Sequence, residues 1–207
     1  MKLAMFSPKG MPLERGWPGR VDDERVVQLA AQTLQVFFTA GGALREHAEY
    51  PLAEVDLRPP VLHPPSVRLY TGSDFVFGNT AAVYGHDDDV PYPEGSSQLR
   101  SGPALAAMIG AHGAIGGFTA ANAWTAPDLP GAKSYDFGLS IGPLLVTPDE
   151  YPAGPEWDER VAVAARNTVL RPGDLLVVGI GGGEPARRGD VVEVAVDGIG
   201  VLKNRIS

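Results

Sequence analysis

The side chains best suited to hold a cation lie together in one short segment of the chain. His86 is followed by Asp87, Asp88 and Asp89, and carboxylate oxygens are the ligands that hard divalent cations prefer. Three aspartates in a turn bounded by glycine and proline more often form a solvated loop, so both interpretations stay open. The remaining histidines are too scattered to share a metal ion: His47, His63 and His112.

A glycine-rich run at residues 179–183, Gly-Ile-Gly-Gly-Gly, could in principle form a phosphate-binding loop. It lacks the following Lys-Ser/Thr pair and the helix start that such loops need. Cysteine is absent, which excludes disulfides and thiolate metal sites. Taken singly, these residues predict no particular reaction.

The composition is that of a folded, acidic protein. The chain has 207 residues, 44% of them hydrophobic, and a formal net charge of −8. Phosphate binding needs clustered lysine and arginine, so nucleic acid is excluded as an expected partner. No apolar run approaches the roughly 20 residues that cross a bilayer. We therefore expect a soluble cytoplasmic protein without a membrane segment.

The elements that must position any site fall into two predicted parts. Residues 1–60 predict a small N-terminal α/β lobe, and residues 61–207 predict the main domain. In the lobe we expect strands at 2–6 and 25–29, and a helix from about 30 to 38 that ends at Gly41 and Gly42. A proline-rich stretch at 58–65 joins the two parts and is extended, because each proline fixes its own φ.

The main domain reads as β-rich, with residues 158–166 as its best helix candidate. Short apolar runs alternate with Gly, Pro and Asp, as is typical of strands and turns. The turns at 172–174 and 188–190 each precede a predicted strand. Apolar residues of the second of these strands fall on both faces, which predicts a strand covered on both sides. The predicted strands include residues 75–77, 104–109, 144–147, 175–180, 191–196 and 200–203.

Six segments, in order along the chain, resemble motifs of the fumarylacetoacetate hydrolase superfamily. Residues 117–129 are similar to its Gly-Tyr-Thr-x-x-Asn-Asp-Trp-Ser-Ala-Arg-Asp-Leu motif, and residues 142–150 to its Gly-Pro-Trp-Leu-Val-Thr-Pro-Asp-Glu motif. Residues 132–137 precede the second of these motifs and belong with it, and the other matching segments are residues 63–70, 85–93, 168–174 and 189–200. The resemblance implies an α+β, β-rich fold: a mixed β-sandwich or roll with few helices, plus the small N-terminal lobe.

The resemblance also implies a divalent cation that binds an oxo acid and stabilises an enolate, but the ligand positions lack donors. The Glu-x-Glu pair falls on Gly102 and Ala104, the ligand aspartate on Ala123, and a fourth ligand on Leu69. Hydrogen, methyl and isobutyl groups cannot ligate a hard cation. We therefore expect a shortened member of the superfamily with no metal cofactor and a shortened lid after Tyr70.

One functional position survives, because Lys133 matches the superfamily's active-site lysine. Buried among apolar replacements, its amine would have a lowered pKa and could act as a base or form an imine. The alternative is an exposed lysine paired with Asp136 or Asp128. The resemblance further implies Tyr135 and Tyr70 as catalytic residues, and a substrate-binding wall made by Arg68, Trp124, Asn122, Ile180 and Gly181.

Two hypotheses follow from these residues. The first is a metal-independent enzyme that acts on a carbonyl, 1,3-dicarbonyl or oxo-acid substrate by C–C cleavage, decarboxylation, tautomerisation or cyclisation. The second is a non-catalytic relative that serves as a ligand-binding or partner subunit. The resemblance implies a homodimer or a heterodimer with a paralogue. A third hypothesis, metal held by other residues, ranks last.

Overall fold

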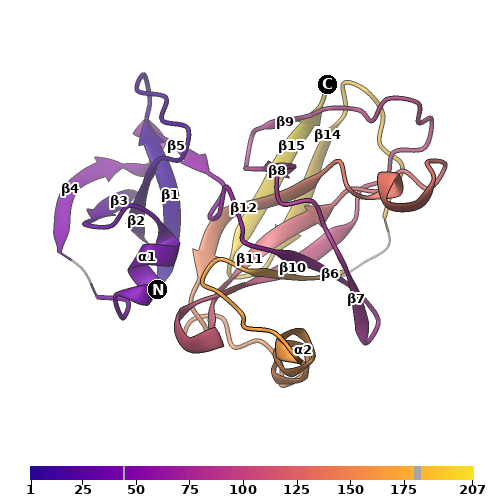
Figure 1. The fold of residues 1–207 in the computed structure, drawn as a ribbon. Coiled ribbons are helices and arrows are strands. Elements are labelled where there is room, and N and C mark those ends of the chain that lie inside the picture. The colour runs from indigo at the N-terminus through magenta and orange to yellow at the C-terminus, as the bar shows by residue number, and fades with distance from the viewer. Residues whose placement is uncertain (44, 180–182) are drawn as a thin grey trace.

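The structure is a computed structural model that describes residues 1–43, 45–179 and 183–207. Strands dominate this part of the chain (Figure 1). Its two α-helices are short, α1 (Leu34–Thr39) and α2 (Glu156–Ala165), and three 3-10 turns occur at η1 (Leu52–Glu54), η2 (Ala111–Gly113) and η3 (Gly131–Ser134). The β-rich class with few helices, predicted from the sequence, is confirmed.

The N-terminal lobe is built on an antiparallel sheet with α1 beside it. The tight turn between its second and third strands places Asp23 at φ 51°, a left-handed conformation that aspartate tolerates. Helix α1 begins later than predicted, because Ala30 donates its N–H to the Arg45 carbonyl and Thr33 caps the helix. The lobe strands are β1 (Lys2–Pro8), β2 (Trp17–Asp22), β3 (Arg25–Leu29), β4 (Glu46–Pro51) and β5 (Val55–Arg58).

The main domain places a three-stranded sheet against the large one. Within the described residues the large sheet has twelve strands, ordered β4-β3-β2-β1-β12-β11-β10-β13-β6-β7, with β5 on β1 and β8 on β12; the small sheet is β14-β15-β9. The domain's strands are β6 (Val67–Thr71), β7 (Asp74–Phe77), β8 (Val83–Tyr84), β9 (Asp89–Val90), β10 (Pro103–Ile109), β11 (Ile115–Ala123), β12 (Leu139–Val146), β13 (Leu175–Gly179), β14 (Val191–Val196) and β15 (Gly200–Ile206).

Hydrogen bonds cross the predicted junction between lobe and main domain. Strand β1 pairs antiparallel with β12, with Lys2 opposite Val146, so both parts share one sheet. Figure 1 shows the lobe on one side of β12 and the small sheet and α2 on the other. The division at residue 60 remains a prediction.

Alternation along the central strands sends side chains to two separate cores. Ala104, Ala106 and Met108 of β10 face one apolar cluster, which also contains Leu34 and Phe37 of α1. The intervening residues of the same strand, Leu105, Ala107 and Ile109, face a second cluster beneath β14, β15 and α2. Successive side chains in a strand point to opposite faces, so sequence neighbours here belong to different environments. We call these the lobe-side face and the small-sheet face.

Strand β14 departs from its prediction. Residues 191–196 were expected to be covered on both sides, and this is wrong: Val191 is 49% exposed, whereas Val194 and Val196 are buried. The small sheet is the outer layer, so only its inner face meets another sheet. Neither described helix is long and apolar enough to cross a membrane.

Candidate functional site

The positions where the resemblance implies metal ligands come together as an apolar wall on the lobe-side face. Ala104 is 1% exposed within the cluster of this face, and Leu69 and Ala123 pack against it half-buried. Val83 of β8 packs against the same cluster, and Leu139 belongs to it. The wall therefore offers methyl and isobutyl groups where a chelating site would need oxygen.

Gly102 completes this set and leaves no room for a side chain. Its N–H donates to Asn122 Oδ1 at 2.6 Å, and its carbonyl accepts from the Ala123 N–H at 2.8 Å. A Cβ placed on Gly102 would lie 2.2 Å from the Ala123 carbonyl oxygen. A carboxylate at position 102 would need the backbone of both strands to move.

The residues present do not fit a divalent cation at this wall. Leu69, Ala104 and Ala123 carry no donor atom, and hard cations need several oxygen ligands. Among the residues that the structure describes, no group of three His, Asp or Glu side chains could hold a metal ion. We derive no step through a metal for this chain.

Gly102 gives a first prediction. Gly102→Ala is expected to lower the free energy of unfolding by about 1–3 kcal/mol through overpacking against the Ala123 carbonyl. Gly179→Ala is the matched control, because its Cβ would lie 3.9 Å from the nearest contact, the Pro103 carbonyl oxygen. Urea unfolding measures both variants. Equal stability of the two would show that the backbone at Gly102 adapts without cost.

Lys133 belongs to η3, and Tyr135 is the residue that caps its C-terminal end. Lys133 is 74% exposed, and its Nζ lies 2.8 Å from Asp136 Oδ2. This is the exposed, paired lysine of the alternative interpretation. Tyr135 is half-buried and adjoins it in sequence. Their catalytic roles remain predictions.

Arg68 and Tyr70 flank Leu69 in β6, so their side chains lie on the small-sheet face. Arg68 is buried 3.8 Å from Asp174 Oδ2 and stacks on Phe75 and Phe77. The Tyr70 hydroxyl donates to the Arg160 carbonyl of α2 at 2.6 Å. Both polar ends are thus held within the fold on the opposite face from Ala104, although Arg68 Nε is buried without a hydrogen-bond partner in the described residues.

Tyr70 also gives a pH prediction. Burial raises the pKa of Tyr70, and burial together with Asp88 raises that of Tyr84. An unfolded chain ionises tyrosine near pH 10, whereas the folded chain retains these protons, so stability falls as the pH rises through about 10 and above. We expect the urea midpoint to fall over that range, and less steeply in Tyr70→Phe. Identical slopes would contradict a buried, protonated phenol.

Asn122 and Trp124 are also engaged within the core. Asn122 is 1% exposed and holds the Gly102 N–H. Trp124 is fully buried in a cluster that includes Val90 and Ile206 of the small sheet, and its Nε1 donates to Ser140 Oγ at 2.9 Å. The other two predicted wall residues, Ile180 and Gly181, lie outside the described residues.

The aspartate loop is tied into the fold. Asp88 Oδ2 accepts from the Gly85 N–H at 2.6 Å and so closes the turn. Asp87 pairs with Lys203 Nζ at 2.9 Å, and His86 Nδ1 accepts from the Lys203 N–H at 3.2 Å. Two of the three carboxylates therefore have partners within the chain. No group of three His, Asp or Glu side chains that could hold a metal ion occurs in this loop, whose residues 86–89 are all described.

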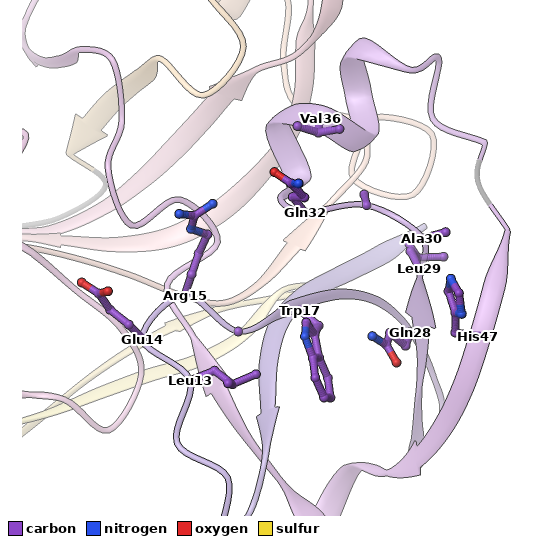
Figure 2. A pocket seen from close by; sticks show the side chains of 12 residues that line it. Leu13, Glu14, Arg15, Trp17, Gln28, Leu29, Ala30, Gln32, Val36 and His47 are labelled. Atoms are coloured by element: carbon purple, nitrogen blue, oxygen red, sulfur yellow. The ribbon is translucent and has the colours of Figure 1, made fainter.

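An open pocket lies elsewhere, in the N-terminal lobe. Five pockets stand out in the described part of the chain, and none of the five is lined by Ala104, Ala123 or Lys133. The largest, about 940 Å³, is lined by Arg15, Trp17 and their neighbours (Figure 2). No sequence pattern predicts this pocket, because its residues come from four separate segments without a motif.

Comparison with solved structures establishes the fold. Maleylpyruvate hydrolase from Sphingobium sp. SYK-6 matches with a TM-score of 0.81 at 19% identity, over 100% of this chain and 99% of that chain. The 5-carboxymethyl-2-hydroxymuconate delta-isomerase from Mycobacterium smegmatis has a TM-score of 0.77 at 20% identity, with 100% and 99% covered. A 2-keto-3-deoxy-D-arabinonate dehydratase has a TM-score of 0.81 at 16% identity, with 100% and 99% covered.

These relatives share the fold of the fumarylacetoacetate hydrolase superfamily, and the fold implied by the six motifs is confirmed. A hydrolase, an isomerase and a dehydratase are all built on it, so the fold does not fix the reaction. The hydrolase was also solved with manganese and pyruvate, and the dehydratase with magnesium and 2,5-dioxopentanoate. No protein-family model and no curated protein sequence matches the chain.

Proposed function

We propose that this chain is a metal-independent small-molecule-binding relative of the oxo-acid enzymes that share its fold. Its relatives include enzymes solved with manganese or magnesium together with an oxo compound. In this chain, hydrocarbon side chains occupy the positions where the resemblance implies metal ligands. The proposal keeps the binding of a small molecule and gives up metal-assisted enolate formation.

One observation carries the proposal: Leu69, Ala104 and Ala123 form a single apolar wall, and Gly102 beside it cannot hold a side chain. A single lost ligand could be replaced by a neighbour. Four positions without donors, gathered on one face, leave a cation nothing to bind. This supports loss of the whole chelating site.

The experiment is turnover of oxo acids, with maleylpyruvate and oxaloacetate as probes, in manganese and in EDTA. We expect no chelator-sensitive turnover, because no step depends on a bound ion. Turnover that manganese supports and EDTA abolishes, at one active site per chain, would overturn the proposal. Calorimetry with pyruvate, with and without manganese, should likewise show no metal-dependent binding.

A metal-independent enzyme that uses Lys133 is the second candidate. The supporting observation is that the Lys133 side chain is 74% exposed and can therefore be reached by a carbonyl compound. Its amine would attack the carbonyl carbon and release water to form an imine, which borohydride reduces to a stable secondary amine. Mass spectrometry after treatment with acetylacetone and borohydride should then find an adduct that Lys133→Ala removes and Lys2→Ala retains. Equal labelling in both variants would count against this candidate.

Assembly with a second copy or a paralogue remains a prediction from the resemblance. The Lys133→Ala variant also tests the partner-subunit hypothesis. A partner subunit should keep its assembly state in that variant, because an exposed ion pair contributes at most about 1 kcal/mol to stability.

A further inference from the structure

The groove in the N-terminal lobe has the size of a small-molecule site. Its volume of about 940 Å³ falls within the range of roughly 300–1,000 Å³ that such sites occupy. It is lined by the segment that leads into β2, the end of β3, the start of the α1 region and His47 of β4 (Figure 2). Leu29 and Ala31 of this groove share the apolar cluster of the lobe-side face, but Leu69, Ala104 and Ala123 do not line it.

Trp17 supplies an aromatic surface in this groove. The side chain is half-buried, and its ring packs edge-on against Phe6 at 6.2 Å and lies 6.3 Å from Tyr50. The other two tryptophans, Trp124 and Trp157, are 0% and 5% exposed. Trp17 is thus the tryptophan that a ligand could reach, and its contacts hold the ring in place. Aromatic side chains fixed in this way are common anchors for planar ligands.

Arg15 supplies a cation without a partner in the described structure. Arg20 and Arg25 of the lobe are ion-paired, with Asp22 and Glu49, whereas no carboxylate in the described residues pairs with Arg15. Glu14 lies beside it on the groove and forms no ion pair with it. An unpaired guanidinium matches the planar, bidentate geometry of a carboxylate.

The backbone fixes Arg15 relative to Trp17. Gly16 between them has φ 76°, and a Cβ there would lie 2.5 Å from the Phe6 carbonyl oxygen. Only glycine meets both conditions, so the chain turns sharply against β1 at this point. The backbone positions from which the Arg15 and Trp17 side chains extend are therefore fixed relative to each other.

Two amides extend the polar part of the groove. Gln28 and Gln32 line it, and their side-chain amides have no hydrogen-bond partner among the described residues, although the Gln28 backbone pairs with β2. Figure 2 shows Arg15 and Gln32 reaching toward the same region beside α1, while Trp17 and Gln28 project side by side from the sheet. The groove thus has a cationic, hydrogen-bonding end and an aromatic end.

We propose that this groove binds an aromatic carboxylate, with the ring against Trp17 and the carboxylate accepting hydrogen bonds from Arg15. The proposal rests on the proposed function in that it names the ligand class of a small-molecule-binding protein. The Gln32 amide is placed to donate to the same carboxylate. No covalent step is involved.

The test follows the indole N–H signals of isotope-labelled protein during titration with benzoate, benzamide and cyclohexanecarboxylate. Benzoate should shift the Trp17 signal, assigned with Trp17→Phe, to saturation and leave the buried Trp124 signal unmoved. Benzamide, the neutral analogue of benzoate, should bind about ten-fold or more weakly than benzoate. Cyclohexanecarboxylate should also bind more weakly, because it lacks a flat ring.

Arg15→Gln should reduce the affinity for benzoate to that for benzamide. Arg166→Gln, an exposed arginine at the end of α2, is the matched control and should change nothing. A Trp17 signal that benzoate does not move, or equal effects of the two arginine variants, would overturn the inference. Either failure leaves the manganese and EDTA result untouched, so it is distinguishable from failure of the proposed function.

Discussion

Asp174→Ala is expected to destabilise the protein by about 3–5 kcal/mol, the usual cost of removing one partner of a buried ion pair. Arg68 and Asp174 have side chains only 5% and 4% exposed. Asp174 also accepts hydrogen bonds from Ser66 Oγ and the Arg171 N–H, both at 2.7 Å. The variant would leave a buried guanidinium uncompensated, and urea unfolding followed by circular dichroism measures the loss.

Asp190→Ala is the matched control for Asp174→Ala. Asp190 closes the same kind of turn, accepting from the Arg187 N–H at 2.8 Å, but it is exposed and faces no buried arginine. We expect it to cost about 1 kcal/mol or less. Equal losses of stability in the two variants would mean that the Arg68–Asp174 ion pair contributes little. Arg68 would then be available to bind a substrate, as the resemblance implies.

Trp124→Ala is expected to cost about 3–5 kcal/mol, as large aromatic truncations in a core do. The ring is fully buried among Val90, Leu99 and Ile206. Trp124→Phe keeps most of this packing but leaves Ser140 Oγ without its donor, so about 1–3 kcal/mol is expected for it. Urea unfolding should rank the wild type above the phenylalanine variant and the alanine variant last.

Trp17→Phe serves as the control for Trp124, because Trp17 is only half-buried and should lose less stability. A Trp124→Ala variant as stable as wild type but defective in small-molecule binding would contradict the core assignment. It would instead support the substrate-binding role that the resemblance implies.

Local turn chemistry made parts of the fold predictable. Gly173 and Gly189 have φ of 93° and 87°, and in each turn the following aspartate accepts from the backbone N–H three residues earlier. Each turn precedes a strand, β13 or β14, as the sequence indicates. Such short-range hydrogen bonds are encoded by a few adjacent residues.

Strand β11 is held by tertiary contacts and could not be predicted from local sequence. Strand β11 runs through glycine and alanine positions such as Gly117 and Ala120, which have low strand propensity. Its position between β10 and β12 gives it hydrogen bonds on both sides. Gly117 is small because a Cβ would lie 2.8 Å from the Leu145 side chain. In β11, close packing between strands therefore outweighs the low strand propensity of glycine and alanine.

For the site, the motifs identified the sequence positions of the missing ligands. They did not show which face of each strand those side chains occupy. Leu69 lies between Arg68 and Tyr70, so in a strand its side chain must oppose theirs. Likewise, Ala123 points away from Asn122. The alternation of a strand already separates the ligand positions from these predicted substrate-binding residues. The exposure of Lys133 depends on the path of η3, which no local pattern fixes.

Paramagnetic broadening by manganese tests the central claim most directly, because it reports where an ion binds. The backbone amide signals of Ala104 and Ala123 flank the wall that lacks ligands, and the Asp87 amide reports on the acidic loop. Our account predicts that added Mn²⁺ leaves the Ala104 and Ala123 signals unchanged. Their selective loss at one ion per chain, restored by EDTA, would contradict it.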